Sequence, residues 1–190
     1  CLSRGLGDVY KRQDYIMSGV WQIILNPTRV VEGQYDLWLP SENVLNRGTG
    51  FLYPDEEVTL TIPSTADKVI SVGAYDALTF SYASFSGRGY TWQDERTKPD
   101  LVAPGVNVKT TAVGGGVTVV SGTSFATPFV TGASALLMEW GIVRGNDPFL
   151  YGEKVKAYLR RGARELPGFG KYPNREVGYG RLCLERSLPD

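Results

Sequence analysis

The sequence contains no histidine, and this absence limits its chemistry more than any other feature. Histidine is the usual general base of hydrolases because its unperturbed pKa is roughly 6.5, close to physiological pH. A chain without it can carry a nucleophile, but it cannot by itself hold a serine–histidine–aspartate triad. Any hydrolytic chemistry assigned to this sequence therefore needs a base from another stretch of protein.

Cysteine is scarce, and neither sign of charge is in excess. Cys1 and Cys183 cannot form a disulfide framework, and the neighbouring leucines make a buried thiol the better interpretation of Cys183. Twenty basic and twenty acidic side chains cancel, so no overall field attracts nucleic acid or an anionic membrane.

Long apolar runs are absent too. The longest, residues 128–138, is too short and too rich in small and hydroxyl side chains to span a bilayer. Apolar residues make up 42% of the chain and charged residues 21%, which is typical of a soluble globular protein. We expect no membrane span. Residues 1–13 lack periodicity and resemble a translated cloning scar, so we expect the natural chain to continue upstream.

Residues 20–62 alternate between apolar and polar side chains with the period of a β-strand. The alternation is clearest at 21–25, 35–39 and 58–62, and turn residues separate these runs. Alternation of this kind predicts antiparallel strands with one buried face. We therefore expect a small sandwich or jelly-roll-like module over residues 14–65.

After Pro63 the pattern indicates an α/β arrangement. Short apolar strands are predicted at 68–74, 100–103 and 117–120, followed by a long helix from Ser124 to about Trp140. That helix has almost no polar face before its last turn, so we expect it to be central and buried. On this view the substitution Leu136→Ala costs about 2–5 kcal/mol.

A second helix is predicted to begin at Asp147 as N-cap with Pro148 in the first turn. One side carries an apolar stripe: Val155, Tyr158, Leu159 and Leu166. The cations are expected to face away: Lys154, Lys156, Arg160, Arg161 and Arg164. Because the chain is neutral overall, we interpret this cationic side as a solvated surface rather than a basic groove.

The most informative segment is residues 117–128, in which a β-rich run leads through a glycine turn to a serine and the long helix. The free N–H groups and the positive end of a helix stabilise negative charge. Ser124 at that position therefore has an oxyanion donor in its own backbone amide.

Residues 122–128 (Gly-Thr-Ser-Phe-Ala-Thr-Pro) resemble the nucleophile motif of the subtilase family, Gly-Thr-Ser-x-Ala-x-Pro. Three further stretches resemble family landmarks in the right order: 80–89, 98–105 and 178–180. The resemblance covers about residues 68–184. It implies a subtilisin-like serine endopeptidase that cleaves peptide or protein substrates. We assign no cofactor and no metal-ligating residues, and calcium binding stays open.

The resemblance also implies roles for particular residues. Ser124 would form the acyl-enzyme, and Ser121, Gly122 and Thr123 would line the substrate cleft. The chain order of the family, aspartate then histidine then serine, places the two missing triad members upstream, together with the oxyanion asparagine. We therefore expect residues 66–190 to be the C-terminal part of a parallel-sheet catalytic domain, completed by the missing N-terminal part of the same protein.

The β-rich module resembles the jelly-roll insertion of a branch of the family related to spore-germination proteases, and residues 35–40 and 151–159 also resemble that branch. By this resemblance the protein would be extracytoplasmic or spore-associated. Phe129 stands where the family commonly has a non-catalytic histidine. Some members of the branch are inactive, so a catalytically dead binding or regulatory protein stays an alternative. A third hypothesis is a β-sandwich binding module, residues 20–65, fused to a relic.

Other interpretations of the same residues are weaker. An α/β-hydrolase needs a histidine after the serine, and the chain has none. A Ser-Lys dyad of the Ser-x-x-Lys type fails because no serine has a lysine three residues later. A Ser124 that only caps the helix does not explain the ordered landmarks. Residues 55–57 lack calcium-loop spacing and read as a solvated turn, and Asp94 with Glu95 reads as an exposed loop. Asp76 and Asp100 are assigned no triad role, because there is no histidine to orient.

Overall fold

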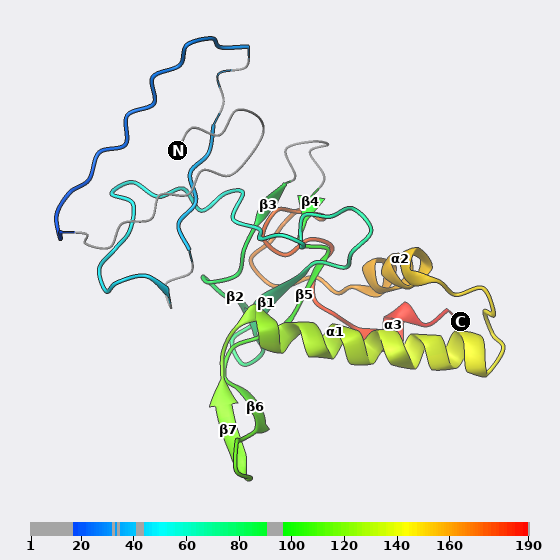
Figure 1. Cartoon of the computed structure of the whole chain (residues 1–190). Helices are drawn as coiled ribbons and strands as arrows, with labels where there is room; N and C mark the ends of the chain where they lie inside the picture. The colour runs from blue at the N-terminus through cyan, green and yellow to red at the C-terminus, as the bar shows by residue number, and fades with distance from the viewer. Residues whose placement is uncertain (1–16, 32, 34, 41–43, 91–96, 190) are drawn as a thin grey trace. The chain divides into compact units, whose positions relative to one another are not determined.

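The computed structural model describes residues 17–31, 33, 35–40, 44–90 and 97–189, and the chain divides into two units, Cys1–Gly50 and Phe51–Asp190 (Figure 1). The predicted scar at 1–13 lies outside the described residues. The second unit begins earlier than residue 66, so residues 51–65 are described with it. The domain boundaries inferred from the sequence stay predictions.

The described residues of the first unit form no β-strand, so the strands expected at 21–25 and 35–39 are not found there. Their apolar side chains are exposed, including Trp21, Ile23 and Trp38. A strand is stable only where a neighbouring strand satisfies its backbone groups, and these runs have no strand partner among the described residues. The jelly-roll-like module as a whole stays a prediction.

The strand expected at 58–62 is also not found, for a local reason. Val58 has φ of 56°, which is incompatible with a strand and leads the chain into a turn. Thr59 then donates its N–H to the carbonyl oxygen of Arg88 at 3.0 Å, so this segment is held by the core instead of by a strand partner.

A three-stranded sheet of order β2-β1-β5 forms the centre of the second unit. Strand β1 (Val72–Asp76) pairs in parallel with β5 (Leu101–Pro104) and antiparallel with β2 (Ser81–Tyr82). The predicted strand at 100–103 is confirmed within one residue, and the one at 68–74 begins later. The mixed α/β class predicted from the sequence is confirmed.

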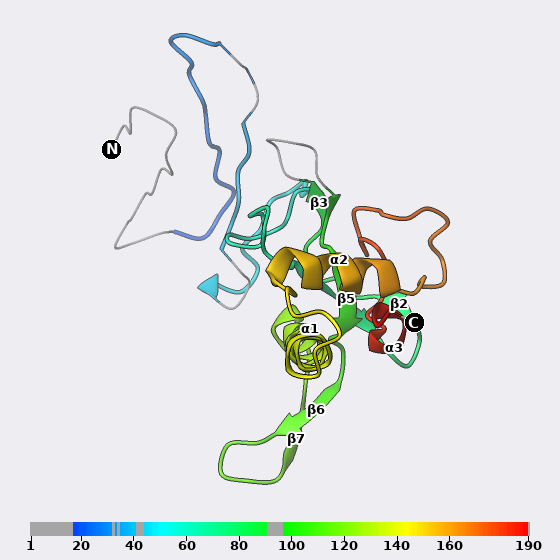
Figure 2. The same cartoon turned by 90° about the vertical axis from the view of Figure 1, so that its right-hand side faces the viewer.

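Two hairpins complete the strands of this unit. Strand β3 (Gly89–Tyr90) pairs antiparallel with β4 (Thr97–Lys98). Strand β6 (Val108–Thr111) pairs antiparallel with β7 (Val117–Val120), the strand predicted at 117–120. The β6–β7 hairpin projects from the unit, as Figures 1 and 2 both show.

Helix α1 (Thr123–Met138) crosses the sheet and continues as a π-helical turn, η2 (Glu139–Val143). The long helix predicted from Ser124 is thus confirmed. It contacts β1 and β5 through a narrow face of small and branched side chains: Ala126, Val130, Ala133 and Leu137. These side chains lie in the main core cluster with Leu101, Leu150, Val155 and Leu159.

The expectation that α1 is buried all round is wrong for the described chain. Phe129 is 44% exposed and Leu136 is 53% exposed, because no described element packs on their side of the helix. Within the described residues, the continuous helix Thr123–Val143 is long and apolar enough to cross a membrane by length and composition. The apolar run counted from the sequence, residues 128–138, is shorter than this helix because it stops before the π-helical turn. Since one face packs on the sheet, we interpret this stretch as a core helix.

Helix α2 (Gly152–Gly162) begins five residues after Asp147, the N-cap expected from the sequence. Its N-cap in the structure is Tyr151. The Asp147 carboxylate accepts hydrogen bonds from Lys154 Nζ at 2.6 Å and from the Tyr158 hydroxyl at 2.8 Å, so it ties the loop to the helix side instead of capping its end. A short helix, α3 (Leu184–Ser187), follows, and Cys183 before it is half-buried rather than buried.

Adjacent leucines of α1 give a test of this packing. Leu137 is fully buried, so Leu137→Ala should lower the free energy of unfolding by about 2–5 kcal/mol. Leu136→Ala, on the exposed side, should cost less than about 1 kcal/mol. Urea denaturation followed by circular dichroism measures both values, and equal losses would contradict the burial of one face alone.

Candidate functional site

The loop between β7 and α1 places Ser124 in the first turn of the long helix, and Ser124 is exposed. Gly122 is the N-cap, with φ of 152° and ψ of 156°. Residues other than glycine rarely adopt this backbone conformation. No side chain caps the helix and its first turn contains no acidic residue. The N–H groups of Thr123 and Ser124, at the start of this turn, are therefore free to face a ligand.

Contacts from the end of β5 hold this turn in place. Gly122 donates its N–H to the carbonyl oxygen of Gly105 at 2.8 Å, and Phe125 donates to Gly122 at 3.1 Å. A Cβ on Gly105 would lie only 2.6 Å from that of Ala74 in β1 and 3.3 Å from that of Ala126 in α1. The absence of a side chain at Gly105 lets sheet and helix meet directly behind Ser124.

The other residues expected in the site lie in the same turn. Ser121 precedes the N-cap, and its Oγ accepts a hydrogen bond from the backbone N–H of Asn107 at 2.9 Å. Thr123 is the first residue of α1, and its carbonyl oxygen accepts from Thr127 Oγ1 at 3.0 Å. The structure thus brings Ser121, Gly122, Thr123 and Ser124 together. That they line a substrate cleft stays a prediction.

The described acids do not complete a catalytic constellation at Ser124. Asp76, at the end of β1, accepts the backbone N–H of Leu78 at 2.8 Å and closes a turn. Within the described ranges, histidine, cysteine, aspartate and glutamate form no group of three that suits a metal ion. Asp94 and Glu95 lie outside these ranges. Among the described residues, the Ser124 turn is the part of the expected site that is formed.

The reading of residues 55–57 as a solvated turn is correct only in part. Asp55 Oδ1 accepts the N–H of Glu57 at 2.9 Å, as expected for a turn. Glu56 and Glu57, however, form ion pairs with Arg88 at 2.6 and 3.4 Å. These pairs attach the turn to the loop that follows β2.

Sequence reasoning missed a buried charge cluster around Asp100. The side chain of Asp100 is completely buried, and its Oδ2 accepts the N–H of Ser71 at 2.6 Å and lies 3.3 Å from Lys98 Nζ. Its Oδ1 accepts hydrogen bonds from the Arg160 guanidinium and lies 3.3 Å from Lys156 Nζ. Three cations therefore surround one carboxylate.

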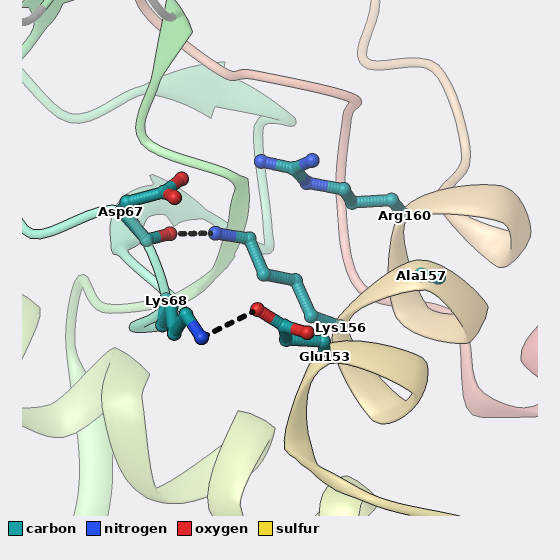
Figure 3. Close-up of a pocket in the computed structure, with 6 residues that line it drawn as sticks. All are labelled: Asp67, Lys68, Glu153, Lys156, Ala157 and Arg160. Atoms are coloured by element: carbon teal, nitrogen blue, oxygen red, sulfur yellow. Dashed lines mark hydrogen bonds and ion pairs between the residues drawn. The ribbon is translucent and has the colours of Figure 1, made fainter.

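The prediction that Lys156 and Arg160 face away into solvent is consequently wrong. Lys156 is 7% exposed and donates to the carbonyl oxygens of Asp67 at 2.7 Å and Val69 at 2.9 Å. Figure 3 shows its amine reaching across from α2 to Asp67, beside a cavity of about 330 Å³. Arg160 also stacks over the ring of Tyr179, with its Cζ 4.9 Å from the centroid. Helical periodicity gives no signal for such burial, because it depends on a partner far away in sequence.

Burial lowers the pKa of the Lys156 amine to about 8. This value is the net result of several effects. The neighbouring charges of Lys98 and Arg160 lower the pKa in the same direction as burial, while Asp100 opposes the shift. A neutral amine still has two N–H groups for the carbonyls of Asp67 and Val69, so its contacts survive loss of the proton.

Removal of the Asp100 carboxylate tests the charge cluster. Asp100→Asn leaves buried cations without a counter-charge, so we expect a loss of about 3–5 kcal/mol in the free energy of unfolding. Glu153→Gln breaks the ion pair between Glu153 and Lys68, whose two side chains are 51% and 80% exposed, respectively. This substitution should lower the free energy of unfolding by less than about 1 kcal/mol. Chemical denaturation of both variants checks the difference, and an Asp100→Asn variant as stable as Glu153→Gln would contradict it.

The lowered pKa of Lys156 predicts a pH dependence of known sign. Between about pH 8 and 10.5 the unfolded chain keeps the Lys156 proton and the folded chain loses it, so this group makes stability rise with pH. The wild type should therefore gain up to about 3 kcal/mol relative to Lys156→Met across that interval. Denaturation of both proteins at pH 7 and pH 10.5 measures the difference in free energy of unfolding between wild type and variant. The contributions of the other titrating groups are the same in both proteins and cancel in this difference. A difference that falls as the pH rises would refute the sign.

The subtilase family matches residues 52–180, which contain β1 to β7, α1, α2 and the Ser124 turn. The CspB protease of Clostridium perfringens is similar in structure, with a TM-score of 0.72 and 50% identity over 75% of this chain and 30% of that protein. The serine protease AprX of Bacillus subtilis is 35% identical over 156 residues, which are 72% of this chain and 33% of AprX. The membrane-bound transcription factor site-1 protease of Mus musculus is 38% identical over 134 residues, 12% of its length. The chain spans about a third or less of these relatives, and it belongs to the subtilase family.

Proposed function

We propose that this chain supplies the nucleophile of a subtilisin-like serine endopeptidase, with the catalytic histidine and aspartate delivered by an N-terminal part of the same protein. The observation that carries the proposal is the exposed Ser124 in the uncapped first turn of α1, on a turn fixed by Gly105 and Gly122. The family match supports the same chemistry.

In the proposed reaction, the Ser124 Oγ attacks the carbonyl carbon of a peptide bond while its proton passes to the delivered histidine. The carbonyl oxygen becomes an oxyanion, which the Ser124 N–H and the positive end of α1 stabilise. Collapse of this intermediate breaks the C–N bond, and the histidine returns the proton to the leaving amine. Water then attacks the carbonyl carbon of the ester while its proton passes to the histidine. The C–O bond to Ser124 breaks, the histidine returns the proton to the Ser124 Oγ, and the carboxylic acid product leaves.

The turn before Ser124 has a proposed role in holding substrate. Gly122 in its extended, positive-φ conformation presents backbone rather than side chain at the N-cap, which leaves room for a peptide to approach. Ser121 is tied to Asn107 and so keeps this backbone in place. We infer that Ser121, Gly122 and Thr123 line the substrate cleft beside Ser124.

The exposed side of α1 is where we place the rest of the protein. Phe129 and Leu136 are 44% and 53% exposed and lie seven residues apart on one side of the helix, an apolar surface that a complete globular domain would cover. Since this chain spans 30% of the CspB protease and 33% of AprX, a covering segment of the same protein fits this surface. The jelly-roll insertion and the spore-germination branch belong to the same proposal, and they rest on the sequence resemblance alone.

Labelling by a fluorophosphonate tests the nucleophile. The chain alone should show no turnover of peptide substrates, because it contains no histidine. Co-expressed with the coding segment that precedes it in its gene, it should be labelled at Ser124, and Ser124→Ala should abolish labelling. Thr131→Ala, two turns further along the exposed side of α1, is the matched control and should be labelled normally.

Mass spectrometry of the labelled peptide identifies the modified residue. Ser124-dependent hydrolysis by the isolated chain would refute the need for a delivered base. A folded complex that binds the upstream segment but takes no label would instead favour the catalytically inactive homologue acting as a binding or regulatory protein.

A further inference from the structure

A second site lies at the other end of the unit, between the C-terminal end of α2 and helix α3. A hollow of about 710 Å³ is formed there by three arginines, one glutamate and two apolar residues: Arg161, Arg164, Arg186, Glu185, Leu188 and Pro189. None of these residues belongs to the Ser124 turn or to the Asp100 cluster. We propose that this hollow, named here the arginine hollow, binds an acidic peptide segment through its carboxylates.

The charge balance of the arginine hollow is the first observation. Arg164 lies 3.4 Å from the carboxylate of Glu185, while Arg161 and Arg186 have no carboxylate partner among the described residues. Among the described residues that line the hollow, three positive charges against one negative charge leave a local excess. The chain as a whole has no net charge, so this excess is local and does not produce the extended field that nucleic-acid binding requires.

The rigidity of the scaffold is the second observation. Gly162, the last residue of α2, lies directly against the backbone and hydroxyl of Ser187 in α3 and leaves no room for a Cβ. Ser187 is fully buried, and its hydroxyl donates to the carbonyl oxygen of Cys183 at 2.8 Å. Because the two helices are locked at their crossing, the arginine side chains start from fixed backbone positions. A preformed site loses less conformational freedom when a ligand binds.

The third observation is the carboxylate already present. Glu185 is 85% exposed and contacts Arg164 only at 3.4 Å, so it is a weak internal ligand that an incoming carboxylate can displace. Guanidinium groups bind carboxylates in a planar, two-pronged geometry. Leu188 and Pro189 add an apolar wall that suits the aliphatic part of a peptide better than a free inorganic anion.

Isothermal titration of the full chain with a defined probe tests the proposal. The probe is an acetylated, amidated hexapeptide of alternating glutamate and leucine, and the matched peptide replaces each glutamate by glutamine. The acidic peptide should bind with an affinity that falls as salt rises, and the glutamine peptide should not bind. Inorganic phosphate, titrated separately, should bind at least about tenfold more weakly, because it gains nothing from the apolar wall.

Four single variants and one double variant locate the binding. Arg161→Gln and Arg186→Gln should each weaken the acidic peptide roughly fivefold, and their combination roughly twentyfold, as expected for partly exposed charged contacts. Glu185→Gln should tighten binding roughly two- to fivefold, because it removes the competing carboxylate. Lys109→Gln, an exposed cation on β6, is the charge-matched control and should leave the affinity unchanged.

The outcomes separate this proposal from its rivals and from the proposed protease function. Equal binding of phosphate and peptide would replace the peptide site by a simple anion site. Equal losses in the Lys109→Gln control, or no tightening in Glu185→Gln, would overturn the arginine hollow as the location. Circular dichroism of each variant confirms folding. Binding at the arginine hollow needs no reaction at Ser124, so neither result depends on the other.

Discussion

The buried carboxylate of Asp100 is the interaction on which the second unit depends. It joins the loop before β1 through Ser71, the strand β4 through Lys98, and helix α2 through Lys156 and Arg160. These segments are far apart in sequence, and a buried charge is tolerated only where opposite charges and hydrogen bonds surround it. The same residue begins the path through β5 to Gly105, whose carbonyl oxygen holds the N-cap of α1.

The features predicted correctly from the sequence are those that depend on residues close together in the chain. Helix α1, strand β7 and the place of Ser124 between them follow from residues adjacent in sequence, and these predictions are confirmed. Lys156 was misplaced because a lysine on a helix normally keeps its charge in water. Its burial depends on Asp100, 56 positions earlier in the chain, and no periodic pattern contains that information.

The strands expected between residues 20 and 62 fail for the same physical reason. Alternation records which side chains a strand would bury, but pairing depends on partners elsewhere in the protein. Without a paired strand among the described residues, Trp21 and Ile23 stay exposed. Val58 adds a purely local obstacle, its positive φ, which alternation of hydrophobicity does not reveal.

The division between local and distant information also explains why a chain without histidine still forms the Ser124 turn. Gly105, Gly122 and the first turn of α1 fix the position of Ser124 through hydrogen bonds of 2.8 and 3.1 Å, which need nothing beyond β1 and β5. In the proposed function, the base and the side-chain oxyanion donor come from other backbone segments. The sheet-facing side of helix α1 is buried while Phe129 and Leu136 are exposed, so the Ser124 turn is formed in a chain whose outer helix surface is uncovered. In the proposed function, assembly of the site then requires docking onto a preformed Ser124 turn rather than folding of that turn.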